Sequence, residues 1–289
     1  MTDVTIASSA LTAKIAARGA ELVALDTAQG QPLLWHGDPA WWSGRAPLLF
    51  PIVGRLPGDK ALIDGASYDL PQHGFARGST FTLVSGDASF CCYELVSTPE
   101  LMARYPRDFA LRVAYEISGA SLRVTATVIN RDARPMPFSF GYHPAFRWPL
   151  ASGAERSGHC LVFGDDETAP IHRPDDGLLS AWTEASPVID RRIALSDALF
   201  DKGALIFTQP RSRRVTYQGP DGTRLTVAFD GMPHLGIWTK PGAPFVCIEP
   251  WQGYAAPVGF AGELATKPGI VILPPSASAG YSMTIAVST

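Results

Sequence analysis

Alternation of apolar and polar residues with a period of two dominates the chain and predicts strands joined by tight turns. Residues 61–63 and 66–70 flank Asp64-Gly65, a dipeptide that tolerates positive φ, and therefore predict a hairpin. Two further pairs follow the same pattern: 111–118 with 121–130 around Gly119-Ala120, and 214–218 with 223–229 around the turn 219–222. All three pairs predict antiparallel strands.

Helical patterns are short and few. Thr98-Pro99-Glu100 has the form of an N-cap followed by proline in the first turn, and it predicts a short helix over 101–104. Residues 196–201 predict one or two further helical turns. Because strands do not alternate with long helices, Rossmann and TIM-barrel architectures are excluded. The stretches 151–160 and 164–190 predict long loops or an excursion at a sheet edge rather than a domain linker.

The pattern therefore predicts an all-β protein built mainly of antiparallel hairpins. Its 289 residues are enough for two average domains, but β-sandwiches of this size commonly form one continuous core. We expect a single domain over 1–289. A charged fraction of 18%, below the roughly 25% typical of soluble proteins, together with 27 glycines and 25 prolines, suits many strands and tight turns.

The charge and the N-terminal sequence narrow the class of protein. A net charge of −3 gives no electrostatic footprint for nucleic acid. Asp3 stands where a signal peptide would carry Lys or Arg, and no apolar run reaches about 18 residues. We expect a cytoplasmic protein that binds neither nucleic acid nor membrane.

Several chemistries are set aside from the residues alone. The motifs GxSxG, GxxxxGK[ST], GxGxxG and HExxH are absent, and the six histidines never fall at i, i+2 or i, i+4 spacing. The cysteines, at 91, 92, 160 and 247, lack CxxC and metal-finger spacing. Cys91 and Cys92 should point to opposite faces of one strand, and buried structural thiols are the favoured interpretation. The sequence predicts no metal and no cofactor.

Two apolar strands lead into a titratable residue followed by proline. Phe-Val-Cys-Ile-Glu-Pro (245–250) carries Glu249, and Phe-Gly-Tyr-His-Pro (140–144) carries His143. The residue before proline is extended and proline cannot donate to a strand ladder, so each strand should end there. A carboxylate in apolar company is either paired or poised to handle protons. The alternatives are that Glu249 caps a strand or pairs with an arginine, and that His143 packs as a half-buried histidine.

Several separated segments resemble the aldose 1-epimerase (mutarotase) superfamily, closest to its bacterial LacX-like branch. They are Pro47-Leu-Leu-Phe-Pro-Ile-Val-Gly-Arg55, Gln72-His73-Gly-Phe-Ala-Arg77, Tyr105-Pro106 with Phe109, Phe140-Gly-Tyr-His143-Pro-Ala-Phe146, and the stretch from Gly236 to Gly253 that contains Glu249-Pro-Trp. The resemblance runs in order from about residue 20 to about residue 275. It implies a galactose mutarotase-like fold, a large antiparallel β-sandwich (supersandwich) with few short helices, whose concave face holds a sugar.

The resemblance also implies a reaction, the interconversion of sugar anomers. Glu249 would take the proton of the C1 hydroxyl and His143 would protonate the ring oxygen from the opposite side, so that the ring opens, rotates about C1–C2 and closes again. By the same resemblance, His73 contacts the substrate near the ring oxygen and Arg55 holds a hydroxyl. Asp201 matches a sugar-binding aspartate of the family, with a surface residue of a short helix as the alternative.

Aromatic residues complete the expected site. Phe75, Trp238 and Trp251 would supply an apolar wall for the C–H face of the sugar, although such side chains also build β cores. Tyr142 stands where relatives commonly carry a small residue. It would narrow the pocket or add a hydroxyl contact.

Three functions remain open at this point. The first is an aldose 1-epimerase acting on a free sugar, and the second is a hexose-6-phosphate 1-epimerase with Arg45, Arg55 and Arg77 as phosphate ligands. The third is a non-catalytic sugar-binding sandwich, because a fold alone does not fix function. Glu249 and His143 favour an isomerase. The sequence names neither the sugar nor the choice between monomer and homodimer.

Two physical expectations follow for His143 and Glu249. The reactive atoms of His143 and Glu249 should lie within roughly 10 Å of one another. To work near neutral pH, Glu249 must be ionised although its apolar flank raises its pKa, and His143 must hold a proton. This predicts a bell-shaped pH profile with an acidic limb from Glu249 and an alkaline limb from His143.

Overall fold

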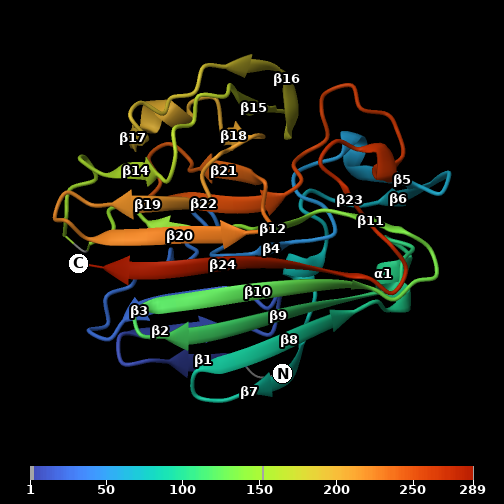
Figure 1. Ribbon diagram of the computed structural model, residues 1–289, viewed down its shortest axis with the longest axis horizontal. Coiled ribbons are helices and arrows are strands. Elements are labelled where there is room, and N and C mark those ends of the chain that lie inside the picture. The colour runs from blue at the N-terminus through green and yellow to red at the C-terminus, as the bar shows by residue number, and fades with distance from the viewer. Residues whose placement is uncertain (1–2, 152, 289) are drawn as a thin grey trace.

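The structure is a computed structural model that describes residues 3–151 and 153–288. Two large antiparallel sheets make up most of it, and Figure 1 shows the strands of the larger sheet crossing the molecule side by side. In spatial order the larger sheet consists of β17 (Arg192–Ala194), β14 (Cys160–Phe163), β19 (Arg214–Gln218), β20 (Arg224–Asp230), β24 (Ser278–Ser288), β10 (Ser121–Asn130), β9 (Phe109–Ser118), β8 (Phe90–Val96) and β7 (Thr82–Gly86).

The second large sheet carries the segments singled out in the sequence. In spatial order it consists of β16 (Leu178–Glu184), β15 (Ile171–Asp175), β18 (Leu205–Phe207), β21 (His234–Trp238), β22 (Phe245–Gln252), β12 (Phe140–Tyr142) and β4 (Leu48–Leu49), with β13 (Ala145–Arg147) also paired to β22. β15 and β16 belong to the stretch 164–190 and lie at the edge of this sheet, in line with the expected excursion at a sheet edge.

Smaller elements complete the fold. They are the sheet of β1 (Val4–Ala7), β2 (Leu11–Ile15) and β3 (Leu22–Thr27), the pairs β5 (Lys60–Ile63) with β6 (Ala66–Asp69) and β11 (Met136–Phe138) with β23 (Val271–Leu273), the helix α1 (Pro99–Met102), and the 3-10 turns η1 (Pro57–Asp59), η2 (Ala76–Gly78), η3 (Asp197–Phe200) and η4 (Leu264–Thr266). The predicted all-β fold with few short helices is confirmed.

Local sequence signals explain where these elements begin and turn. The three predicted hairpins are confirmed as β5–β6, β9–β10 and β19–β20. Asp64 and Gly65 both have positive φ, as a two-residue hairpin turn requires. The hydroxyl of Thr98 caps the first turn of α1 by accepting from the Leu101 N–H.

The core lies between the two large sheets. Along β9 and β10 buried and accessible residues alternate, so that one face of the larger sheet packs inward. Phe140 of β12 stacks on Tyr281 of β24, with ring centroids 5.4 Å apart. One continuous apolar cluster includes residues of both sheets and defines a β-sandwich.

Tyr142 links the two sheets across this core. Its hydroxyl accepts from the Ala126 N–H at 3.0 Å and lies 2.9 Å from the carbonyl oxygen of Tyr281, to which it can donate. The expectation that Tyr142 narrows the pocket or contacts substrate is therefore wrong. Successive side chains on a strand face opposite sides, so Tyr142 points into the core while His143 points away from it.

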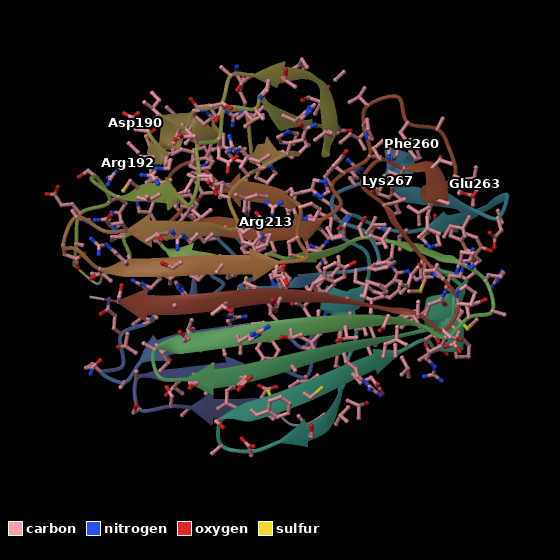
Figure 2. All side chains as sticks on the ribbon, viewed as in Figure 1. Asp190, Arg192, Arg213, Phe260, Glu263 and Lys267 are labelled. Carbon is pink, nitrogen blue, oxygen red and sulfur yellow. The ribbon has the colours of Figure 1, made fainter. Side chains whose placement is uncertain are left out.

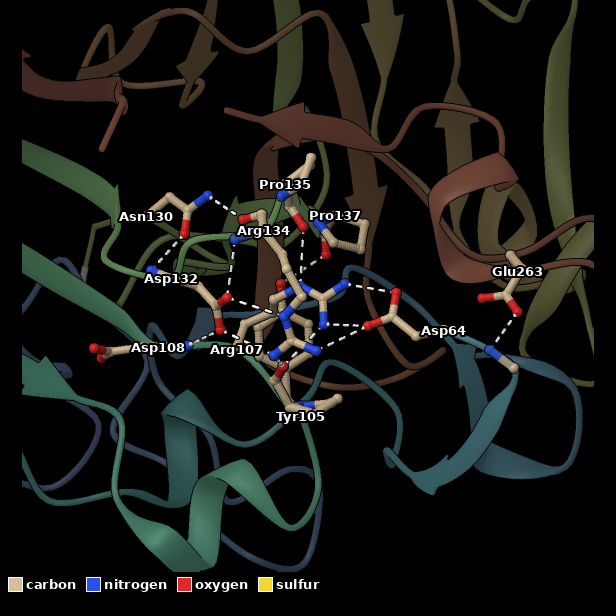
Figure 3. Close-up of polar contacts among 12 residues, drawn as sticks. Asp64, Tyr105, Arg107, Asp108, Asn130, Asp132, Arg134, Pro135, Pro137 and Glu263 are labelled. Carbon is tan, nitrogen blue, oxygen red and sulfur yellow. Dashed lines mark hydrogen bonds and ion pairs between the residues drawn. The ribbon is translucent and has the colours of Figure 1, made fainter. Parts of the chain in front are cut away.

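Ionic contacts hold the β5–β6 turn against neighbouring segments (Figure 3). The buried guanidinium of Arg107 donates two hydrogen bonds of 2.9 Å to the carboxylate of Asp64, and Arg134 adds a third at 3.1 Å. Glu263 accepts from the Gly65 N–H on the neighbouring side. This arrangement fixes the hairpin against the segment that follows β22.

The segment after β22 covers the same end of the molecule, where Figure 2 labels Phe260, Glu263 and Lys267. The ammonium of Lys267 is buried and donates to the carbonyl oxygens of Tyr254 and Pro268. Within the described part of the chain, no helix combines the length and the apolar character needed to cross a membrane.

We predict that Tyr142→Phe lowers the free energy of unfolding by about 1–3 kcal/mol, because the Ala126 N–H loses a buried partner. Urea denaturation measures the change. Tyr68→Phe, at a half-buried position of β6, is the control and should shift the midpoint much less. Equal effects of the two substitutions would contradict a linking role for Tyr142.

Candidate functional site

Strand β22 is buried along almost its whole length and continues through Pro250 to Gln252. The expectation that proline ends this strand is wrong, and the hydrogen-bond pattern gives the reason. The backbone N–H of Ile248 donates to the carbonyl of Pro144. Alternate residues of a strand direct their backbone groups toward the same neighbouring segment, so the nitrogen of Pro250 also faces the segment that contains Pro144. Pro250 lies between Cys247, the last β22 residue paired with β13, and Trp251, the first paired with β12, so little is lost by the missing donor.

His143 and Pro144 occupy this interruption. The expectation that β12 delivers His143 and stops before proline is confirmed, since β12 ends at Tyr142. Glu249 lies opposite the gap, on the face of β22 turned away from the core. The two prolines therefore open the ladder at the point where the imidazole and the carboxylate meet.

The side chains of His143 and Glu249 are in direct contact. Nε2 of His143 lies 3.2 Å from Oε2 of Glu249, and their side chains are 9% and 2% exposed. The distance meets the expected limit of roughly 10 Å. It also overturns the expectation that acid and base stand on opposite sides of a sugar ring, because no ring fits between atoms in hydrogen-bond contact.

Burial sets the proton content of this pair. Loss of hydration raises the pKa of the Glu249 carboxyl well above its ordinary value, with the Trp251 indole acting in the opposite direction. Loss of hydration also lowers the pKa of His143 to about 3, and the charge of Arg77 adds to that shift. Burial therefore favours the uncharged form of each group over an ion pair.

The pair lies in the wall of a cavity of about 330 Å³, within the size range of small-ligand sites. Three indoles line the same cavity. The ring of Trp42 stacks on the His143 imidazole with centroids 4.8 Å apart, and Trp238 meets that imidazole edge-on at 5.9 Å. Trp251 lies beside the carboxylate on β22.

Two glycines make room for Trp251. A Cβ on Gly236 would lie 2.3 Å from the indole, and one on Gly141 would lie 2.7 Å from it. The two glycines belong to the strands on either side of β22, so the indole lies across three strands at once. Any larger residue at these positions would displace the ring from the cavity wall.

His73 enters the cavity from a loop with left-handed backbone geometry, at φ 66°. Its Nδ1 accepts a hydrogen bond of 3.1 Å from the Gly54 N–H. Burial lowers the pKa of His73 well below its ordinary value, with the His143 ring and the Arg77 charge adding to the shift. The ring is therefore neutral and carries its hydrogen on Nε2, which is the only nitrogen left to donate.

Arg77 also lines the cavity. Its Nη2 donates to the carbonyl of Gln72 at 2.8 Å, which fixes the guanidinium at the mouth. Burial lowers the pKa of this guanidinium, while the carboxylate of Glu21 raises it. It nevertheless keeps its charge at any pH that a protein tolerates.

Three other residues expected at the site lie outside the cavity lining. Arg55 pairs with Asp59 at 2.9 Å and contacts Asp176, next to the Gly177 backbone that does line the cavity. Arg45 packs against Gly37, and Asp201 is an exposed residue at the end of η3. The structure thus brings together His73, Arg77, His143 and Glu249, and leaves these three outside the cavity lining.

The structure places some of the expected aromatic residues at the cavity and others elsewhere. Trp238 and Trp251 line the cavity as expected. Phe75 does not, because it is buried in the main core against Phe50 and Tyr105. Trp42 also lines the cavity, although the sequence pattern does not predict it there. It lies in an irregular segment without strand periodicity, and the adjacent pair Trp41-Trp42 is the feature of that segment that could have indicated an aromatic site.

Nδ1 of His143, a buried polar atom at the cavity, has no hydrogen-bond partner among the described residues. Buried donors and acceptors in folded proteins are nearly always satisfied, so an exception calls for an explanation. Its position beside the His143–Glu249 contact marks this cavity as the candidate site.

The fold and this cavity define a class of protein, the galactose mutarotase-like sandwiches with a buried imidazole and carboxylate in one pocket. The model of the aldose 1-epimerase family matches residues 2–271, and the chain belongs to that family. The chain is 32% identical to the chromosomal protein LacX of Lactococcus lactis subsp. lactis, over 95% of this chain and 96% of that protein.

Solved structures agree with this assignment. A galactose mutarotase related enzyme from Lactobacillus acidophilus superposes with a TM-score of 0.94 at 30% identity, covering 100% of this chain and 98% of that one. A galactose mutarotase-like protein from Lactobacillus casei superposes with a TM-score of 0.91 at 28% identity, covering 99% and 100%. The expected family and fold are confirmed.

We predict that the His143 imidazole stays neutral from about pH 5 to about pH 8, because burial lowers its pKa. Carbon-13 NMR of labelled histidine should show no titration of its resonance in that range. The same sample unfolded in urea is the reference, where the ring should titrate near about 6.5. A folded-state midpoint near that value would contradict the uncharged pair.

Proposed function

We propose that this protein is an aldose 1-epimerase, an isomerase that interconverts the α and β anomers of an aldose. The observation that carries the proposal is the buried contact of 3.2 Å between His143 and Glu249 in the wall of a sugar-sized cavity. We also propose that residues 1–289 act as one catalytic domain, since the cavity draws on segments from Trp42 to Ala255.

Anomer exchange needs two proton transfers at neighbouring atoms. Glu249 takes the proton of the C1 hydroxyl as the bond from C1 to the ring oxygen breaks, and His143 gives a proton to that ring oxygen. The open aldehyde rotates about C1–C2. Closure reverses both transfers on the other face of the carbonyl, so that the pair returns to its starting state and no cofactor is consumed.

The short contact suits this chemistry better than an arrangement on opposite sides of the ring. The hydroxyl oxygen and the ring oxygen are bonded to the same carbon, so their two proton partners must also be neighbours. At rest burial keeps the shared proton on Glu249. A sugar hydroxyl that donates to the carboxylate favours its ionised form, and the proton then passes to His143.

The remaining groups position the sugar. The Nε2–H of His73 donates to a ring or hydroxyl oxygen, and Trp251 and Trp238 offer apolar surfaces to the C–H face. Arg77 binds an oxygen at the mouth. Arg55 acts indirectly, because its contacts with Asp176 hold the turn that contributes Gly177 to the wall.

Replacement of either proton-transfer residue tests the proposal. We expect Glu249→Gln and His143→Asn to lower kcat for anomer exchange by about 10²–10⁴-fold while sugar affinity changes little, since each removes a general acid or base. Saturation-transfer NMR across a panel of free and 6-phosphorylated aldoses measures the exchange. Glu116→Gln and His36→Asn, both exposed, are the matched controls.

Two results would count against the assignment. Near-normal exchange by Glu249→Gln on a good substrate would leave Glu249 as a structural residue. Sugar binding without accelerated exchange of any aldose by the unaltered protein would favour a non-catalytic carbohydrate-binding sandwich.

The pH dependence of kcat/KM reports the proton content of the free pair. Activity should be flat across neutrality. It should fall on the acid side only where His143, with its pKa lowered to about 3, takes up a second proton. It should fall on the alkaline side where Glu249, with its pKa raised, loses the shared proton. This exchanges the two limbs expected from the sequence, and an acidic limb near about pH 6.5 would contradict it.

A second candidate is a hexose-6-phosphate 1-epimerase, favoured by the placement of Arg77 at the cavity. Of the three arginines considered as phosphate ligands, Arg45 and Arg55 lie outside the lining, so a single guanidinium carries this alternative. A planar guanidinium matches phosphate oxygens.

If the substrate is phosphorylated, Arg77→Ala should raise KM for the phosphosugar by about 10-fold or more, since a charge-assisted contact contributes about 1.5–3 kcal/mol, and should spare exchange of the free sugar. Arg77→Lys should recover part of the loss, and Arg123→Ala, at an exposed position of β10, is the control. Equal losses on both sugars would assign Arg77 to bracing the loop through Gln72.

A further inference from the structure

A third donor group lies beside the imidazole and the carboxylate. Ligand atoms of His143, Cys247 and Glu249 all lie within 4.8 Å of one another, and all three residues are buried. Cys247 and Glu249 are two positions apart on β22, so their side chains share the face that carries the cavity. Histidine spacing does not reveal this Cys-x-Glu pair, because the histidine comes from a different segment of the chain.

The distances approach those of a metal site. An ion bound at zinc-like bond lengths of about 2.0–2.3 Å separates tetrahedral donors by about 3.3–3.8 Å. The His143–Glu249 contact is already 3.2 Å, and the thiol needs an approach of about 1 Å to complete the set. His143 and Glu249 line the cavity, so a fourth ligand position opens toward it.

The donor chemistry selects the ion. Thiolate and imidazole are ligands of zinc and similar transition metals rather than of magnesium or calcium. The thiolate and the carboxylate together balance the charge of a divalent ion, so that the Trp35, Trp238 and Phe245 side chains packed around Cys247 surround a site without net charge. Arg77, the charged group at the same cavity, then meets no uncompensated cation.

We propose that His143, Cys247 and Glu249 form a site for Zn²⁺ or a similar transition metal that competes with the sugar. Binding occupies Nε2 of His143 and an oxygen of Glu249, the two atoms that exchange protons in the proposed reaction. The metal is therefore an inhibitor and not a cofactor. The inhibitory part of this proposal rests on the proposed function, whereas the metal site does not.

Cobalt gives a readout that is independent of activity. Titration of the chelator-treated protein with Co²⁺ should produce a thiolate-to-cobalt absorption band in the near ultraviolet, which added Zn²⁺ abolishes. Cys247→Ala should lose the band, and His143→Asn or Glu249→Gln should weaken Co²⁺ binding by at least about 10-fold. Cys160→Ala, which removes a buried thiol at the other large sheet, should keep the band. Near-ultraviolet circular dichroism verifies that each variant is folded.

Absence of the band in the unaltered protein, or its persistence in folded Cys247→Ala, would overturn the site. If the metal competes with the sugar, Zn²⁺ should suppress anomer exchange and a chelator should restore it. Each variant is compared with its own metal-free rate, and on that basis Zn²⁺ should no longer slow exchange by Cys247→Ala. Exchange that continues with the site filled would overturn the inhibition. A cobalt band without exchange of any aldose would support the metal site and reject the proposed function.

Discussion

The interruption of the strand ladder around β22 is the constraint on which the cavity depends. Pro144 and Pro250 lack N–H groups, and both lie between the pairing of β12 with β22 and the pairing of β13 with β22. The registers on either side, Gly141 opposite Trp251 and Ala145 opposite Cys247, place His143 opposite Glu249. Opposite residues of neighbouring strands lie side by side on one face of a sheet, so the two polar side chains meet in surroundings that are otherwise apolar.

That meeting in turn decides the proton chemistry. In water at pH 7 the carboxyl group would be ionised, whereas burial raises the pKa of Glu249 and lowers that of His143, and so favours the uncharged form of both groups. A pair of this kind can give and receive protons without building net charge in the core. The same closeness of donors, with Cys247 included, is the basis of the proposed metal site.

The two faces of the β12 segment show how the scaffold and the site are coupled. Tyr142 links the sheets through hydrogen bonds to the backbone of β10 and β24, while the next residue, His143, enters the cavity. Gly141 and Gly236 leave space for Trp251 on that same face. The cavity wall is therefore positioned by the sandwich core directly beneath it.

The sequence by itself determined the hairpins, the short helices and the family, and it singled out His143 and Glu249 as candidates, because turn dipeptides, caps and residues before proline act locally. Only the tertiary structure decided that Glu249 lies inside a strand, that it touches His143, that Arg55 and Asp201 lie outside the cavity lining, and that Tyr142 faces the core. These depend on which strands become neighbours and on which face each side chain falls. Both are set by pairing between segments that lie far apart in the chain.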